Sequence, residues 1–246
     1  MNEIIFIGLC FFFIAVFYST VGHAGASGYL ATMALLSFAP DVMKPTALVL
    51  NIIVALVTSY QFYNAGLFSW RLFWPFAVAS VPLAYLGGGL AVDPHIYRPL
   101  VGIALVFSAV YLVVRHRFLC NDDAGIQLPG IPTSLLVGGL IGFVSGLTGV
   151  GGGIFLSPVL LIARWAGLRQ TSAFAAFFIL VNSISGLLGH LQKDGTVPEN
   201  LHVWGLVVLS GGFLGASLGA TKINTPVLRA LLSVLLVFAG IKMLAI

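Results

Sequence analysis

Long apolar runs separated by short polar segments dominate this chain of 246 residues. Ten runs can be followed along it, over residues 4–20, 28–39, 46–63, 72–91, 99–114, 133–147, 154–163, 173–191, 203–220 and 226–245. A helix needs about 20 apolar residues to cross ~30 Å of hydrocarbon, so most of these runs predict transmembrane helices. The pattern predicts an all-α polytopic membrane protein with about 8–10 transmembrane helices.

One polar segment divides the runs into five and five. It begins at Arg115 and ends near Gly130, and it contains Asp122 and Asp123. We therefore expect a first transmembrane repeat over residues 1–116, a polar linker over 117–131 and a second repeat over 132–246.

A Gly-rich stretch occurs once in each half. In the second half it covers residues 148–158 and reads TGVGGGIFLSP, and a weaker copy covers residues 22–32 and reads GHAGASGYLAT. Aligning Ser19 with Ser145 also aligns Gly25 with Gly151 and Leu30 with Leu156. We interpret the two stretches as copies of one element, because the matches continue beyond the glycines.

The apolar runs that follow these stretches are too short to span a bilayer. Residues 154–163 supply about half of the ~20 residues required, and residues 28–39 only a little more. Each short run therefore predicts a hairpin with the preceding run, which enters and leaves by one face and has its Gly-rich apex inside the bilayer. With three crossings after each hairpin, the second half is inverted relative to the first.

Composition supports the membrane assignment and limits the chemistry. Hydrophobic residues make up 59% of the chain, charged residues 7%, and the mean hydropathy is +1.09. All seven Asp and Glu residues lie between the apolar runs, so no carboxylate is expected at mid-membrane. Cys10 and Cys120 form no CxxC pair, and we expect no metal and no cofactor. The net charge of +4 is spread over short loops and does not indicate nucleic-acid binding.

Basic residues give an orientation. Seven fall on one predicted side, namely Arg71, Arg115, Arg117, Arg164, Arg169, Lys222 and Arg229, and four on the other, namely Lys44, Arg98, Lys193 and Lys242. The positive-inside rule makes the first side cytoplasmic and places both termini on the non-cytoplasmic side. The four tryptophans, Trp70, Trp74, Trp165 and Trp204, lie near predicted helix ends and are interpreted as interfacial anchors.

The apices favour the binding of a small anion. The first turn of a helix has free N–H groups and the positive end of a dipole, and glycine lets a ligand reach those groups. The candidate substrate-binding residues are Gly22, His23, Gly25, Ser27, Gly28, Thr148, Gly149, Gly151, Gly152, Gly153, Ser157, Asn51 and Asn182. By contrast, Gly215, Gly219 and the glycines at 87–89 are interpreted as sites of close helix packing.

The second Gly-rich stretch, GVGGG at residues 149–153 followed by Pro158 and Leu160, resembles the signature of the sulfite exporter TauE/SafE family. The duplicated halves and the polar linker are also similar. The resemblance implies a multi-pass inner-membrane transporter that exports sulfite or a related organosulfur anion. The first copy departs from the pattern, with His23 opposite Gly149 and Thr32 opposite Pro158.

Two readings stay open for the polar side chains. His23 either donates to an anion or carries a proton, or it is a neutral histidine bonded to a carbonyl at a helix end. Asn51 and Asn182 either reach the substrate or hold helices together.

The leading hypothesis is a secondary transporter and not an enzyme, with a small anion and the lipid bilayer as partners and a homo-oligomer left open. One alternative is an intramembrane serine protease of the rhomboid type, since GASG at residues 25–28 fits its GxSG pattern. Another is a channel or a structural membrane subunit.

Overall fold

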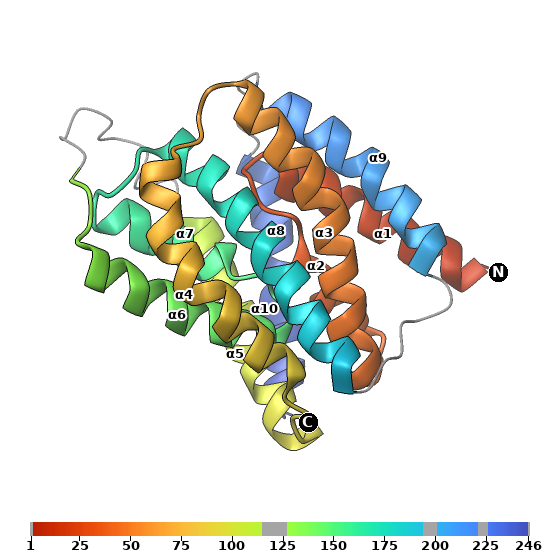
Figure 1. Ribbon diagram of the computed structural model, residues 1–246. Helices are drawn as coiled ribbons and strands as arrows, with labels where there is room; N and C mark the ends of the chain where they lie inside the picture. The colour runs from red at the N-terminus through yellow and green to blue at the C-terminus, as the bar shows by residue number, and fades with distance from the viewer. Residues whose placement is uncertain (1, 115–126, 194–200, 221–225, 246) are drawn as a thin grey trace.

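The computed structural model describes residues 2–114, 127–193, 201–220 and 226–245. All ten predicted runs are helices within these ranges (Figure 1). They are α1 (Asn2–Ser19), α2 (Ala26–Leu35), α3 (Pro40–Asn64), α4 (Trp70–Gly89), α5 (Pro94–Val114), α6 (Ile131–Thr148), α7 (Gly153–Ile162), α8 (Leu168–Lys193), α9 (Leu201–Ala220) and α10 (Pro226–Ala245). Of the linker predicted over residues 117–131, residues 117–126 lie outside the described residues.

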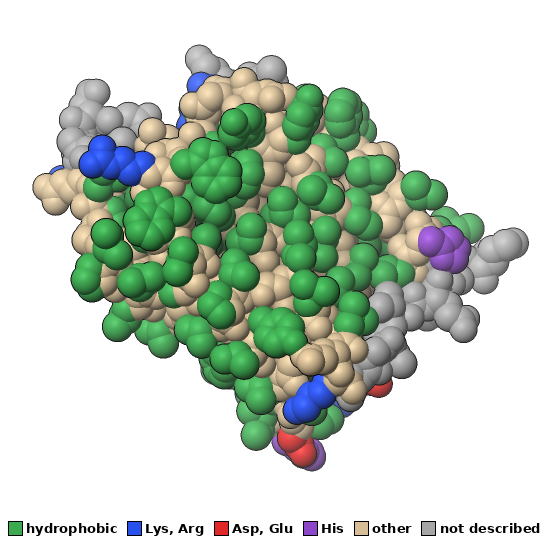
Figure 2. Space-filling model, in the orientation of Figure 1, with side chains coloured by type: hydrophobic (Ala, Val, Ile, Leu, Met, Phe, Trp, Pro, Cys, Tyr) green, Lys and Arg blue, Asp and Glu red, His purple; other side chains and the backbone are tan. Residues whose placement is uncertain are grey.

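The outer surface is that of a membrane protein. Among the described helices, α3, α4, α6, α8 and α9 are long and apolar enough to cross a bilayer. Large apolar side chains such as Leu206, Leu140 and Phe213 are 60% or more exposed, and Figure 2 shows such side chains covering the middle of the molecule while charged groups lie at its edges. The chain is therefore a multi-pass membrane protein.

Glycines allow α4 and α6 to pack in parallel. Every fourth position of α6 faces the corresponding position of α4, pairing Gly138 with Phe76, Gly142 with Ser80 and Gly146 with Ala84. A Cβ at Gly146 would lie 2.0 Å from the carbonyl oxygen of Ala84, so the two backbones are in direct contact. This small-residue packing is a usual way to join helices in lipid.

The helices α1 and α9 repeat the same packing. Gly211, Gly215 and Gly219 of α9 lie against the backbone of Phe12, Val16 and Thr20 of α1, again in parallel (Figure 1). The packing interpretation of Gly215 and Gly219 is confirmed, and so is that of Gly88, where a Cβ would lie 2.0 Å from the carbonyl oxygen of Gly186. In the predicted repeat, α1 corresponds to α6 and α9 to α4. The α1–α9 pair is therefore the counterpart of the α4–α6 pair, since in each the first helix of one half packs against the fourth helix of the other half.

Each hairpin enters and leaves by one face. In the second half, the backbone N–H of Gln127, just before α6, donates to the carbonyl of Arg164, just after α7, at 3.0 Å. In the first half, Phe11 of α1 and Phe38, just after α2, both contact the ring of Trp204. Trp204 is only 3% exposed, so its interpretation as an interfacial anchor is wrong: it joins both arms of this hairpin to α9.

The two hairpins enter from opposite faces. The first belongs to the face on which α3 begins, here called the N-terminal face, and the second belongs to the face on which α4 begins, here called the opposite face. The C-terminal end of α10 lies on the N-terminal face, because Lys242 Nζ donates to the Leu35 carbonyl at the end of α2. This arrangement is consistent with an inverted repeat.

Two crossing helices begin earlier than the apolar runs predict. The helix α3 starts at Pro40 and α8 at Leu168, so each includes a polar first turn. Lys44 is accommodated in α3 at 6% exposure, because its ammonium group donates to the carbonyls of Gly87, Gly88 and Leu90 at the C-terminal end of α4. A cation at that end of a helix is electrostatically favourable.

Candidate functional site

The first apex is the turn between α1 and α2. Gly22 and Gly25 adopt φ values of 81° and 104°, which side chains disfavour. Gly22 also lies against α8, where a Cβ would be 2.3 Å from the carbonyl oxygen of Ser172. The chain therefore turns back inside the protein, and α2 begins with its first nine residues, 26–34, all buried.

The second apex uses three glycines in the left-handed region. Gly149, Gly151 and Gly152 have φ values of 79°, 83° and 79°. A Cβ at Gly151 would lie 2.8 Å from Asn51 Nδ2 and 3.2 Å from Ser183 Oγ. The backbone of this apex is thus pressed directly against polar side chains of α3 and α8.

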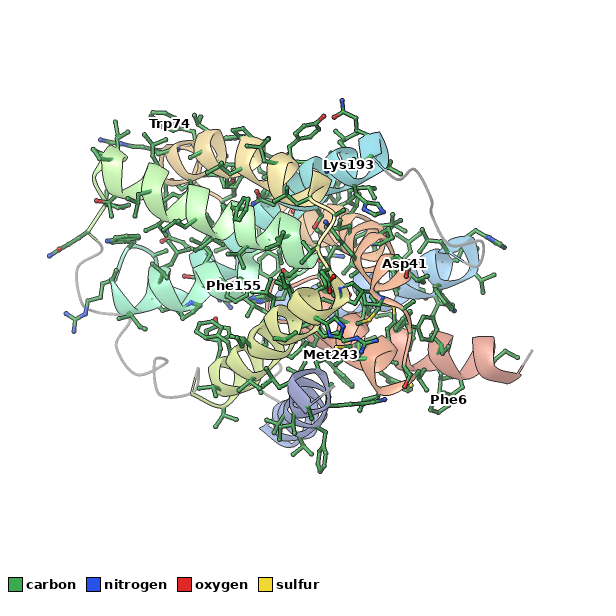
Figure 3. All side chains as sticks on the ribbon, turned by 90° about the horizontal axis from the view of Figure 1, so that it is seen from below. Phe6, Asp41, Trp74, Phe155, Lys193 and Met243 are labelled. Atoms are coloured by element: carbon green, nitrogen blue, oxygen red, sulfur yellow. The ribbon has the colours of Figure 1, made fainter. Side chains whose placement is uncertain are left out.

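Both short helices start without a capping side chain. The N-cap residues of α2 and α7 are Gly25 and Gly152, and glycine has no side chain that could accept a hydrogen bond from the first turn. The N–H groups of a first helical turn have no partner within the helix. Since these turns are buried, they form two positively polarised helix ends inside the protein. Figure 3 shows Phe155 of α7 between Trp74 at one end of the molecule and Asp41 and Lys193 at the other.

A hydrogen bond joins the first apex to the helix that follows the second. His23 is 3% exposed, and its Nε2 lies 3.2 Å from Ser157 Oγ of α7. Its Nδ1 lies 3.2 Å from the Val21 carbonyl, and its ring is 6.0 Å from that of Tyr111. The structure therefore brings together two candidate residues that are separated by more than half of the chain.

The two asparagines differ in what they bond. Asn51 Nδ2 donates to the carbonyl of Val150 and to Ser183 Oγ, each at 3.4 Å, and so connects α3 to the second apex. Asn182 Nδ2 instead donates to the carbonyl of Phe178 in its own helix at 2.8 Å. In the described residues, Oδ1 of each asparagine is buried without a hydrogen-bond partner.

The remaining candidates are held by local contacts. Ser27 Oγ donates to the Tyr18 hydroxyl at 2.9 Å, and Gly28 packs on Ile14. Thr148 Oγ1 donates to the Val144 carbonyl at 2.8 Å. Gly149 packs on the backbone of Lys44, and Gly153 packs on Ile179.

These contacts bear on the protease alternative. A serine nucleophile needs a histidine base within hydrogen-bond reach. The bond described for the Ser27 hydroxyl is to Tyr18, and the nearby His23 bonds Ser157. The constellation that GASG would require is not formed by these described contacts.

A cavity opens beside the second apex. Its volume is about 370 Å³, and it is lined by Pro40, Asp41, Lys44, Leu90, Ala91, Val92, Pro94, Tyr97 and His190. Tyr97 donates from its hydroxyl to the Thr148 carbonyl at 3.1 Å, and the Lys44 backbone contacts Gly149. The cavity thus lies at the N-terminal face, and two of its lining residues contact the second apex.

Sequence reasoning missed Tyr18, Tyr97 and Ser183, which fix the apices by hydrogen bonds between elements. Their partners lie far along the chain or across a turn, and no spacing pattern announces such contacts. Among the described residues, no group of His, Cys, Asp or Glu side chains could hold a metal ion.

Comparison with known proteins gives a consistent result. The family model described as "Sulfite exporter TauE/SafE" matches residues 7–243. A probable membrane transporter protein of Sinorhizobium fredii is 41% identical over 99% of both chains. A probable membrane transporter protein of Methanocaldococcus jannaschii is 26% identical over 83% of this chain and 80% of its own length. No solved structure matches this chain.

Proposed function

Because the chain belongs to the sulfite exporter TauE/SafE family, we propose that it is a secondary transporter of the bacterial inner-membrane type that carries a small anion. Sulfite or a related organosulfur anion is the substrate class that the family description favours. The named relatives, described as probable membrane transporter proteins, support transport as the general function.

The observation that carries this proposal is that two uncapped helix ends are buried and that a side-chain contact links the elements bearing them. The N-termini of α2 and α7 are buried, and the His23–Ser157 contact holds the elements that bear them together. Backbone N–H groups and helix dipoles stabilise an anion without requiring a buried cation. The anion would be bound by N–H groups at residues 26–28 and 151–154, close to the His23–Ser157 pair.

The cavity at the N-terminal face supplies the access route in this proposal. Tyr97 and Lys44 separate it from the second apex, and rocking of one repeat against the other would open the apices to each face in turn. The positive-inside rule would make the opposite face cytoplasmic, since seven basic residues are predicted on that side and four on the other.

A ligand-stabilisation screen tests the substrate class. The purified protein is heated with sulfite, sulfate, thiosulfate, taurine, sulfoacetate or simple carboxylates, and the melting temperature is compared with that in chloride. We expect sulfur oxyanions to raise it by several degrees, and the best of them to show saturable uptake into proteoliposomes. Stabilisation by none of them, with no uptake, would rule the anion site out, and uptake that never saturates would favour the channel alternative.

A further inference from the structure

His23 differs in its location from the acidic side chains of this chain. It lies in the first apex and bonds Ser157 of the other repeat, whereas all seven carboxylates lie between the apolar runs. Tyr111 of α5 is a titratable group that faces it, with its ring at 6.0 Å. The His23 backbone N–H donates to the carbonyl of Tyr18 of α1 at 2.9 Å.

The contacts of the ring with Val21 and Ser157 define two hydrogen-bonding states. The Val21 carbonyl can only accept, so Nδ1 carries a hydrogen in both. In neutral His23, Nε2 accepts a hydrogen bond from the Ser157 hydroxyl group. In the imidazolium form Nε2 donates to Ser157 Oγ, and the hydroxyl proton turns to the Gly153 carbonyl, which lies at 2.8 Å. Protonation of His23 therefore changes the direction of the Ser157 O–H bond and requires no movement of heavy atoms.

The imidazolium form of His23 is linked to a bound anion by electrostatics. Ser157 lies one turn into α7, and Gly153 is the first residue of that helix. The positive end of the α7 dipole opposes a charged imidazolium, and an anion bound at the same helix end offsets that opposition. Binding of the anion and uptake of a proton by His23 therefore favour each other, and this linkage is reciprocal.

We propose that His23 is the proton-binding residue of the transport cycle, with Ser157 as its partner across the repeats, and that one proton moves together with each anion. This assignment rests on the proposed anion site. A dianion accompanied by one proton keeps a net negative charge, so an inside-negative membrane potential still favours its exit.

The test measures protons taken up when an anion binds. Sulfoacetate, methanesulfonate and sulfate serve as probes, since all three stay ionised near neutral pH and a proton taken up must come to the protein. Titration calorimetry in two buffers of different ionisation enthalpy gives the proton count for wild type, His23→Gln and His202→Gln. His202→Gln is the control, because it removes an exposed histidine of α9 that belongs neither to the apices nor to the lining of the cavity.

We expect the dissociation constant of wild type for the best probe to rise about tenfold between about pH 6 and pH 8, and that of His23→Gln to change less than about twofold. His202→Gln should behave as wild type does. If His23→Gln retains the wild-type pH dependence and proton count, or if wild type binds a probe without proton uptake, the proton assignment is wrong while the anion site stands.

A second variant covers a failure of His23→Gln to fold. Ser157→Ala keeps the imidazole and removes the acceptor of its second proton, so fewer protons should be taken up per anion bound. An unchanged count would contradict the proposal. Sulfite is titrated in parallel with its own ionisation subtracted. If wild type binds none of the four anions, the proposed transport function itself fails, and the proton assignment fails with it.

Discussion

The two apices reach a similar backbone course by different means. The second consists of glycine backbone, with left-handed residues at Gly149, Gly151 and Gly152. The first has left-handed glycines at Gly22 and Gly25, with His23 between them and Ser27 just after, and both side chains are hydrogen-bonded. In the anion site that we propose, the second apex would therefore offer backbone N–H groups alone, while the first would add the ionisable side chain of His23.

The largest effect should come from filling the backbone apex. Gly151→Leu adds a side chain at a φ of 83°, where even a Cβ would lie 2.8 Å from Asn51 Nδ2. We expect anion uptake into proteoliposomes to fall at least about 100-fold, because strain of roughly 1–2 kcal/mol adds to a blocked site. Gly66→Leu is the matched control. Gly66 has a φ of 69° and no atom within 4 Å of its Cβ position, so uptake should survive there. Normal uptake by Gly151→Leu would sink the apex hypothesis.

The next effect concerns the side-chain apex. His23→Ala removes the bond to Ser157 and leaves a small void at a buried position. We expect about a tenfold loss of uptake at constant expression, since one polar contact with a ligand or partner is worth about 1.5 kcal/mol. Uptake equal to wild type at both acid and alkaline pH would return His23 to a purely structural role.

Asn51 and Asn182 allow the contact with the second apex to be tested against a bond within one helix. Asn51→Ala removes the bond between α3 and the second apex, whereas Asn182→Ala removes only a bond within α8. We expect Asn51→Ala to lower stability by about 1 kcal/mol and uptake several-fold, and Asn182→Ala to have the smaller effect on both. Thermal unfolding followed by size-exclusion fluorescence measures the first quantity. A larger effect of Asn182→Ala on uptake would place the substrate nearer to α8 than we propose.

The smallest effect should follow Ser27→Ala. Its hydroxyl is bonded to Tyr18, so the change costs about 0.6 kcal/mol of stability, typical of a hydrogen bond in lipid. Uptake should change less than twofold or so, and the order of preference among anions should be kept. A changed order among sulfite, sulfate and sulfoacetate would show that Ser27 contacts the substrate after all.

Much of the fold could be predicted because lipid imposes simple rules. Apolar length alone separated the two ten-residue helices α2 and α7 from the crossing helices, and glycine spacing indicated the close packing at Gly215 and Gly219. The start of α3 was missed because Lys44 looked like a loop residue. Its charge is tolerated only because three carbonyls of another segment surround it.

The candidate site divides in the same way. Backbone positions with positive φ can be predicted from the glycines in the sequence, since other residues are strained in that conformation. The partners of His23 and Asn51 did not, because Ser157 and Val150 belong to the other half of the chain and no local pattern encodes an approach between halves.

Local composition was enough to predict a helical membrane protein with two Gly-rich breaks, because hydrocarbon thickness and backbone strain act on it directly. The folded structure was needed to show that the first break places His23 against Ser157, while the backbone of the second lies against Asn51. Such contacts depend on how α3, α7 and α8 pack, and packing in lipid is settled by shape between distant segments.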